Sequence, residues 1–161
     1  GFQDFGGVGR RFQIKDEVQD IMVVDDYGHH PVEIKATLGA ACAGWSRRVV
    51  AVFQPHRYSR TRDLLEDFGQ VLSSVDNLLV MEVYAAGETP DSSADGRALC
   101  RAVRARGSAI PIFVEDRDQL FEVLTNTLQA GDVLVTLGAG DIGRIAQLLP
   151  GFVSNLAGER S

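Results

Sequence analysis

The sequence predicts an α/β fold built on an open, mostly parallel sheet with helices on both faces. About five apolar, partly β-branched segments of strand length alternate with longer segments whose apolar residues recur at helical spacing. Such alternation is typical of βαβ units, whose right-handed crossovers place helices over the sheet. The chain has 161 residues, of which 45% are hydrophobic, so it can form one domain with a proper core.

The elements are expected in a regular order along the chain. Strands are expected at 21–25, 48–53, 77–83, 110–114 and 132–137, with a short one at 11–14. Helices are expected at 31–43, 61–72, 94–106, 117–128 and 141–149. Pro31 suits a first helical turn, and Thr61 suits an N-cap. We therefore divide the chain into an N-terminal segment (1–16), a folded domain (17–150) and a tail (151–161) that is expected to fray.

Composition excludes several classes of protein. The formal net charge of −6 gives no general attraction to nucleic acid or to an anionic membrane. No apolar run approaches the ~20 residues of a membrane span, and no signal peptide is apparent. Cys42 and Cys100 form no CxxC motif, which favours buried free thiols in a reducing compartment. A cytoplasmic protein is expected, and the initial Gly1 favours a domain excised from a longer chain.

The first predicted strand ends in an unusually polar turn at residues 25–31, Asp-Asp-Tyr-Gly-His-His-Pro. Ligands bind at the carboxyl ends of parallel strands, and a strand-end acid commonly accepts hydrogen bonds from ribose hydroxyls. The histidines raise the question of zinc. Adjacent histidines rarely reach one ion, however, and no further His or Cys follows at ligand spacing, so no metal site is expected.

The second predicted strand is followed by a basic turn. Arg57 and Arg60 lie just before or at the expected helix start, where guanidinium groups and the helix dipole both favour a carboxylate or a phosphate. The alternative is that Arg60 and Arg62 form surface ion pairs with acids such as Asp63 and Glu66.

The last predicted strand is followed by residues 138–143, Gly-Ala-Gly-Asp-Ile-Gly, which fit the GxGxxG pattern of dinucleotide sites. No later strand supplies the acidic residue that such sites place about 20 residues further on. A tight strand-to-helix turn is therefore favoured over a nucleotide-binding or NAD-type module.

Taken together, the motifs are similar to those of the Mur ligases. The turn at 25–31 resembles their Asp-Tyr-Ala-His-x-Pro signature. Residues 53–61 (Phe-Gln-Pro-His-Arg-Tyr-Ser-Arg-Thr) and 82–88 (Glu-Val-Tyr-Ala-Ala-Gly-Glu) resemble the next two landmarks of the branch that joins L-alanine to UDP-N-acetylmuramate. Residues 7–12 (Gly-Val-Gly-Arg-Arg-Phe) resemble the hinge between central and C-terminal domains. A related muropeptide-recycling ligase shares the first motif, but its second landmark differs.

The resemblance implies a Rossmann-like C-terminal domain of a three-domain, ATP-dependent ligase of peptidoglycan synthesis. ATP with Mg would be bound mainly by a central domain, whose Gly-x-Gly-Lys-Thr loop this chain lacks, so the isolated domain is expected to be inactive. UDP-N-acetylmuramate and L-alanine would be the other substrates. A non-catalytic interaction domain is the remaining alternative.

The resemblance also implies roles for individual residues. Arg11 corresponds to an arginine that reaches ATP phosphate. Asp26 corresponds to the acid on the ATP ribose, with Tyr27 and His29 beside the nucleotide. The group that would receive the L-alanine carboxylate is His56, Arg57 and Arg60. Asp25, His30 and Glu88 match motif positions to which the resemblance assigns no role.

Overall fold

The computed structural model describes residues 13–18, 21–45, 47–107 and 109–160. In this part of the chain one sheet has the strand order β1-β2-β6-β3-β4-β5. The strands are β1 (Gln13–Val18), β2 (Ile21–Asp26), β3 (Val49–Phe53), β4 (Asn77–Met81), β5 (Ile112–Val114) and β6 (Val133–Leu137). All neighbours pair in parallel except β1, which is antiparallel to β2. The predicted parallel α/β sheet is confirmed.

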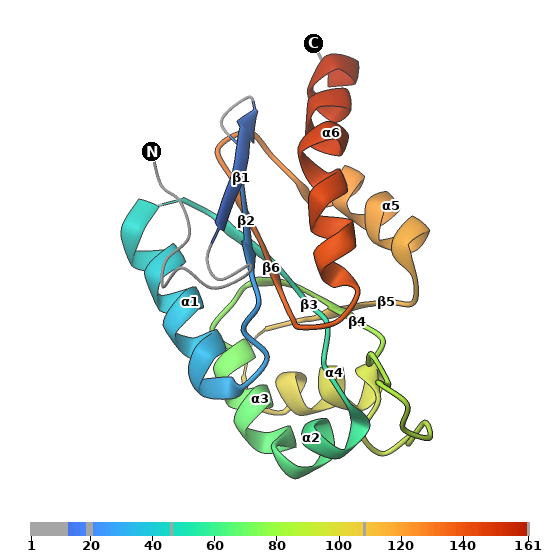
Figure 1. Cartoon of the computed structure of the whole chain (residues 1–161). Coiled ribbons are helices and arrows are strands. Elements are labelled where there is room, and N and C mark those ends of the chain that lie inside the picture. The colour runs from blue at the N-terminus through green and yellow to red at the C-terminus, as the bar shows by residue number, and fades with distance from the viewer. Residues whose placement is uncertain (1–12, 19–20, 46, 108, 161) are drawn as a thin grey trace.

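Helices cover both faces of this sheet (Figure 1). Their bounds are α1 (Pro31–Trp45), α2 (Tyr58–Asp63), α3 (Leu65–Leu72), α4 (Gly96–Arg104), α5 (Arg117–Thr127) and α6 (Ile142–Arg160). One core cluster joins the sheet to α1, α3 and α4, and a second joins it to α5 and α6. Among the described residues, no helix combines the length and apolar character needed to cross a membrane.

The central strands are apolar throughout because both of their faces are covered. In β3 all residues are buried; Val49, Ala51 and Phe53 belong to the first cluster, whereas Val50 and Val52 belong to the second. This alternation is the period of two expected of a strand between two helical layers. It explains why unbroken apolar runs, rather than alternating ones, marked the strands in the sequence.

The helix expected at 61–72 is wrong at its start. The structure has two short helices, α2 and α3, separated at Leu64. Thr61 is not an N-cap: it is buried inside α2, and its hydroxyl donates to the Arg57 carbonyl at 2.8 Å. Such i−4 bonding is the other way in which a helical threonine satisfies its hydroxyl group. Arg57 is therefore the cap position, and Arg60 lies within the helix.

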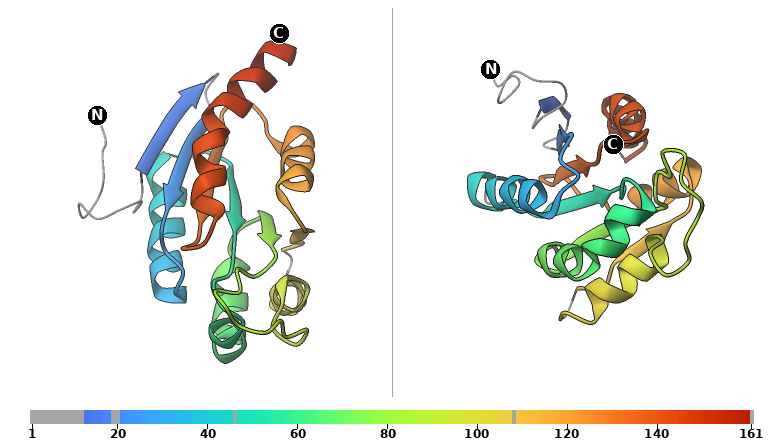
Figure 2. Two further views of the ribbon diagram at one scale, coloured as in Figure 1. Left: turned by 45° about the vertical axis from the view of Figure 1, so that its right-hand side comes forward. Right: turned by 60° about the horizontal axis from the view of Figure 1, so that its bottom comes forward.

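The tail expected to fray after Pro150 is helical instead. Helix α6 continues to Arg160 and lies beside β1 and β2 (Figure 2). Val153, Leu156 and Ala157 are buried, and the Arg160 guanidinium donates to the carbonyls of Leu128 and Thr125 at 2.8 and 2.7 Å. Proline removes one helical hydrogen bond, but burial of this apolar stripe offsets that cost.

The N-terminal boundary also differs from the expected one. Strand β1 spans the expected division between residues 16 and 17, so Gln13 to Asp16 belong to the sheet. Residues 1–12, which include Arg11 and the expected hinge, lie outside the described residues.

At the end of the sheet opposite the polar turns, an ion pair joins the starts of two neighbouring strands. Arg48 donates to both oxygens of Asp132, at 2.9 and 2.8 Å, and also to the carbonyl of Thr127. Asp132 is 2% exposed, and its hydrogen bond to the Arg48 side chain is the main cause that raises the pKa of Arg48. The pair joins the residues directly before β3 and β6, at the end of these strands opposite the polar turns.

Candidate functional site

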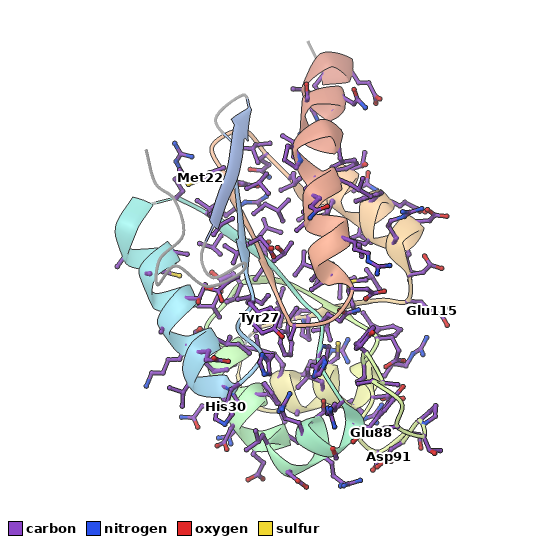
Figure 3. All side chains as sticks on the ribbon, viewed as in Figure 1. Met22, Tyr27, His30, Glu88, Asp91 and Glu115 are labelled. Carbon is purple, nitrogen blue, oxygen red and sulfur yellow. The ribbon has the colours of Figure 1, made fainter. Side chains whose placement is uncertain are left out.

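The loops that follow β2, β3 and β4 bring four rings into one row. Tyr27 meets His29 edge-on with centroids 5.4 Å apart, and His29 lies 5.7 Å from His56. His56 in turn stacks on Tyr84, with centroids 5.6 Å apart and planes 13° from parallel. The row lies at the carboxyl ends of the parallel strands, where Figure 3 labels Tyr27 and His30. The sequence-based expectation that these turns share one edge is confirmed.

The acids of the first turn face inward. Asp26 is 1% exposed; its Oδ1 accepts the Gly28 N–H at 2.6 Å and its Oδ2 accepts the Thr37 hydroxyl at 2.7 Å. Asp25 is also buried and accepts the Thr136 hydroxyl at 2.7 Å. Asp26 thus holds the backbone of the loop from a buried position, with a hydrogen bond to each of its carboxylate oxygens. The same loop presents Tyr27, which is 42% exposed, to solvent.

The histidines of this turn directly precede helix α1. Glu33 Oε1 accepts the backbone N–H groups of His29 and His30, both at 3.1 Å, while His30 Nδ1 accepts the Val32 N–H at 3.3 Å. The Glu33 bond to the His30 N–H is one half of a capping box, and the His30 imidazole caps the Val32 N–H in place of a serine or threonine hydroxyl. His30 therefore has a structural role. Within the described ranges, no group of three or more His, Cys, Asp or Glu side chains could hold a metal ion.

The loop after β3 is bonded to the loop after β4. The Arg57 N–H donates to the Tyr84 carbonyl, and the Tyr84 N–H donates to the Pro55 carbonyl, both at 2.8 Å. Arg57 has a φ of 73°, a left-handed conformation that costs free energy in a residue other than glycine. The two bonds hold this strained residue so that Arg57 is exposed beside His56.

The basic side chains of this loop lie together. Arg60 Nη1 is 3.3 Å from His56 Nδ1; because a guanidinium only donates, Nδ1 must accept, which leaves a proton on Nε2. Burial is the main cause that lowers the pKa of His56, and nearby cationic groups, Arg60 first, lower it further. The imidazole is therefore neutral near pH 7, with an N–H available to a ligand.

No carboxylate in the described part of the chain forms an ion pair with Arg57 or Arg60. The surface-pairing alternative holds only for Arg62, which lies 3.7 Å from Asp63 and 3.1 Å from Asp91. The arginines open on a cavity of about 560 Å³, lined by His30, His56, Arg57, Ser59, Arg60, Asp63 and Leu64. This arrangement suits a small carboxylate or phosphate.

The expectation that the basic residues lie just before or at a helix start holds for Arg57, which is the N-cap of α2, but not for Arg60, which lies within the helix. Helix α2 begins at Tyr58, and the Ser59 N–H near its start already donates to the Glu88 carboxylate at 3.0 Å.

The glycine-rich turn after β6 packs against the protein itself. A Cβ at Gly138 would lie 2.8 Å from the Gln54 carbonyl oxygen, and one at Gly140 would lie 2.7 Å from Tyr84 Cγ. The Ile142 N–H, which could otherwise face a phosphate, donates to Gln54 Oε1 at 3.0 Å. The glycines thus permit a close approach of Gln54 and Tyr84, which supports the tight-turn interpretation over a dinucleotide site.

Sequence reasoning missed the roles of the residues that hold the site together. Glu33, Thr37, Tyr84 and Glu88 each fix a loop without belonging to an expected ligand group. Glu33 could have been found, since it lies three residues after a helix cap and fits the capping-box pattern. Thr37, Tyr84 and Glu88 act through contacts with distant residues, which no local pattern reports.

Comparison with known proteins agrees with this geometry. The family model described as Mur ligase, glutamate ligase domain, matches residues 10–140. The UDP-N-acetylmuramate–L-alanine ligase of Methylococcus capsulatus is 57% identical over 151 residues, which are 91% of this chain and 32% of the relative. The chain thus spans about a third of the length of that curated relative.

Two solved structures resemble this chain in fold. The UDP-N-acetylmuramate–alanine ligase of Thermotoga maritima matches with a TM-score of 0.73 and 29% identity, over 95% of this chain and 31% of that one. A murein peptide ligase from Psychrobacter arcticus matches with a TM-score of 0.72 over 94% of this chain and 31% of that one, but at 23% identity it shows the fold alone. The chain belongs to the Mur ligase family, whose glutamate ligase domain it contains.

Proposed function

We propose that this chain is the amino-acid-binding domain of a UDP-N-acetylmuramate–L-alanine ligase. The observation that carries the proposal is the cluster of neutral His56, Arg57 and Arg60, whose two guanidinium groups form no ion pair with a carboxylate of the described residues. The identity to an enzyme named for this reaction adds support. As a ligase of peptidoglycan synthesis, the full-length protein would work in the cytoplasm.

In the proposed reaction, ATP phosphorylates the carboxylate of UDP-N-acetylmuramate and leaves as ADP. The amine of L-alanine then attacks the acyl phosphate, an amide forms, and inorganic phosphate departs. The alanine carboxylate must be bound away from the phosphorylation site, because it would otherwise compete with the UDP-N-acetylmuramate carboxylate for the phosphoryl group. Two guanidinium groups and the His56 Nε2–H can bind it by charge-assisted hydrogen bonds and leave the amine directed outward. Orientation of this kind makes a large contribution to two-substrate reactions.

We place the nucleotide beside Tyr27 and His29, whose rings adjoin the proposed carboxylate site. Arg11, which lies outside the described residues, would contact the phosphates of this nucleotide. Asp26 supports this loop from its buried position, and its assignment to the ribose requires the loop to open. The described residues do not fit a magnesium site, so we assign the metal to the remainder of the full-length protein.

The test is a ligase assay on the full-length protein with UDP-N-acetylmuramate, ATP and L-alanine, scored by phosphate release. We expect turnover with L-alanine and none from the isolated 161-residue chain. Turnover only with a cell-wall tripeptide in place of L-alanine would move the assignment to a muropeptide-recycling ligase. Turnover by the isolated chain would refute the proposed division of ATP chemistry between domains.

A further inference from the structure

The Glu88 carboxylate binds the helix that carries Arg60. Glu88 lies in the loop after β4 (Figure 3), and its Oε1 accepts the Ser59 N–H at 3.0 Å. Its Oε2 accepts the Ser59 hydroxyl at 2.5 Å. Both carboxylate oxygens thus accept a hydrogen bond from Ser59, which lies between Arg57 and Arg60 in the sequence.

The backbone of the β4–α4 loop is shaped to direct Glu88 toward α2. Ala86 and Gly87 both have positive φ values, 52° and 90°, and the Glu88 N–H donates to the Ala85 carbonyl at 3.0 Å. A left-handed alanine is costly and persists only when surrounding contacts enforce it. The bonds between Glu88 and Ser59 are contacts of this kind.

Helix α2 has only 6 residues, so its own hydrogen bonds cannot fix its position. The loop after β4 holds the backbone on either side of the start of α2: the Tyr84 carbonyl accepts the Arg57 N–H, and the Glu88 carboxylate binds Ser59. Because Glu88 forms its bonds with Ser59, its negative charge lies near Arg57 without forming an ion pair. The guanidinium groups are therefore oriented but remain available to a ligand.

We propose that Glu88 is a positioning residue for amino-acid binding: through Ser59 it holds Arg57 and Arg60 in the geometry that receives the substrate carboxylate. This inference rests on the proposed function. It predicts that loss of the Glu88–Ser59 bonds weakens amino-acid binding more than it affects ATP, the UDP-sugar or folding.

Asp91 provides a matched control within the same loop. Its carboxylate also reaches α2, but it binds Arg62 at 3.1 Å, and Arg62 is 54% exposed and does not line the cavity. Asp91→Asn removes the same charge as Glu88→Gln without altering the contact to Ser59. An exposed pair of this kind contributes little to stability.

The experiment compares Glu88→Gln, Ser59→Ala, Ser59→Thr and Asp91→Asn in the full-length ligase, with Arg60→Ala in parallel. Glu88→Gln and Ser59→Ala should each raise the KM for L-alanine about tenfold, while the KM values for ATP and UDP-N-acetylmuramate change less than about twofold. Ser59→Thr keeps the hydroxyl and should restore the KM, and Asp91→Asn should leave it unchanged. The double variant Glu88→Gln/Ser59→Ala should raise the KM for L-alanine by less than the product of the two single effects, because both substitutions disrupt the bond between the Ser59 hydroxyl and the Glu88 carboxylate, whereas the Ser59 N–H remains in Ser59→Ala.

An unchanged KM for L-alanine in Glu88→Gln, together with a raised one in Arg60→Ala, would overturn the positioning role and leave the proposed function intact. Unchanged values in both would refute the amino-acid site itself. If Glu88→Gln raised all three KM values equally and lowered the thermal midpoint, its role would be structural only, which also overturns the inference. Should Glu88→Gln fail to fold, Ser59→Ala compared with Ser59→Thr decides the question.

Discussion

Replacement of Arg60 by alanine tests the proposed carboxylate site most directly. The Arg60 side chain is half-buried, donates to His56 Nδ1 at 3.3 Å and to the His56 carbonyl at 3.5 Å, and forms no ion pair with a described residue. Removing one partner of a desolvated charge pair costs about 2–5 kcal/mol. Because the cavity is open and Arg57 remains, we expect the lower end, about 2 kcal/mol, which corresponds to about 30-fold in affinity.

The assay measures initial rates of the full-length enzyme while each substrate is varied in turn. Arg60→Ala should raise the KM for L-alanine about 30-fold and leave those for ATP and UDP-N-acetylmuramate within about twofold. Arg60→Lys keeps the charge but loses the planar two-pronged donor, so its KM should be intermediate. Arg62→Ala is the control, because Arg62 lies on the same helix but binds Asp91 outside the cavity.

An unchanged KM for L-alanine in Arg60→Ala would remove Arg60 from the carboxylate site. An equal rise for all three substrates would show that the substitution disturbs the fold or the closure of the enzyme instead. Either result would refute the reasoning that the absence of an ion pair marks this guanidinium as a ligand group.

Three further predictions concern the domain itself. The folded state lowers the pKa of His56 below its ordinary 6.5, so the unfolded chain binds this proton more tightly. The free energy of unfolding should therefore fall as the pH drops below 6.5. Urea titrations at several pH values should show a smaller fall in His56→Asn. Asp132→Asn leaves Arg48 without its ionic partner and should cost about 2 kcal/mol of stability without changing the KM for L-alanine. Leu156→Ala should cost about 3 kcal/mol in the same titrations, and no loss would mean that the helix beyond Pro150 does not pack on the sheet.

Much of the fold could be predicted because its local and tertiary signals agree. The strand predicted at 48–53 is observed as β3, Val49–Phe53. Every residue of β3 is apolar and buried. Pro31 was expected in the first turn of a helix and is the first residue of α1. At such positions the sequence pattern and the packing impose the same structure, so a local pattern is sufficient.

The failures occur where a distant contact decides the local structure. Pro150 suggests a helix end, but α6 continues because Val153 and Leu156 meet the sheet. Thr61 suggests a helix start, but the start lies at Tyr58, where the Glu88 side chain from another loop binds Ser59. Asp26 could be placed at the strand end, but not its burial, which depends on the Thr37 hydroxyl. Local patterns carry no information about these partners.

The same contacts explain how an acidic chain can offer an anion site. With a net charge of −6, the domain should repel carboxylates and phosphates unless the acids near the anion site are held by other hydrogen-bond donors. Asp26, Glu33 and Glu88 all lie in or beside the three loops, and each accepts hydrogen bonds from neutral N–H or O–H donors. None of them forms an ion pair with Arg57 or Arg60 among the described residues. Each carboxylate shapes a loop while leaving both guanidinium groups to bind an incoming anion.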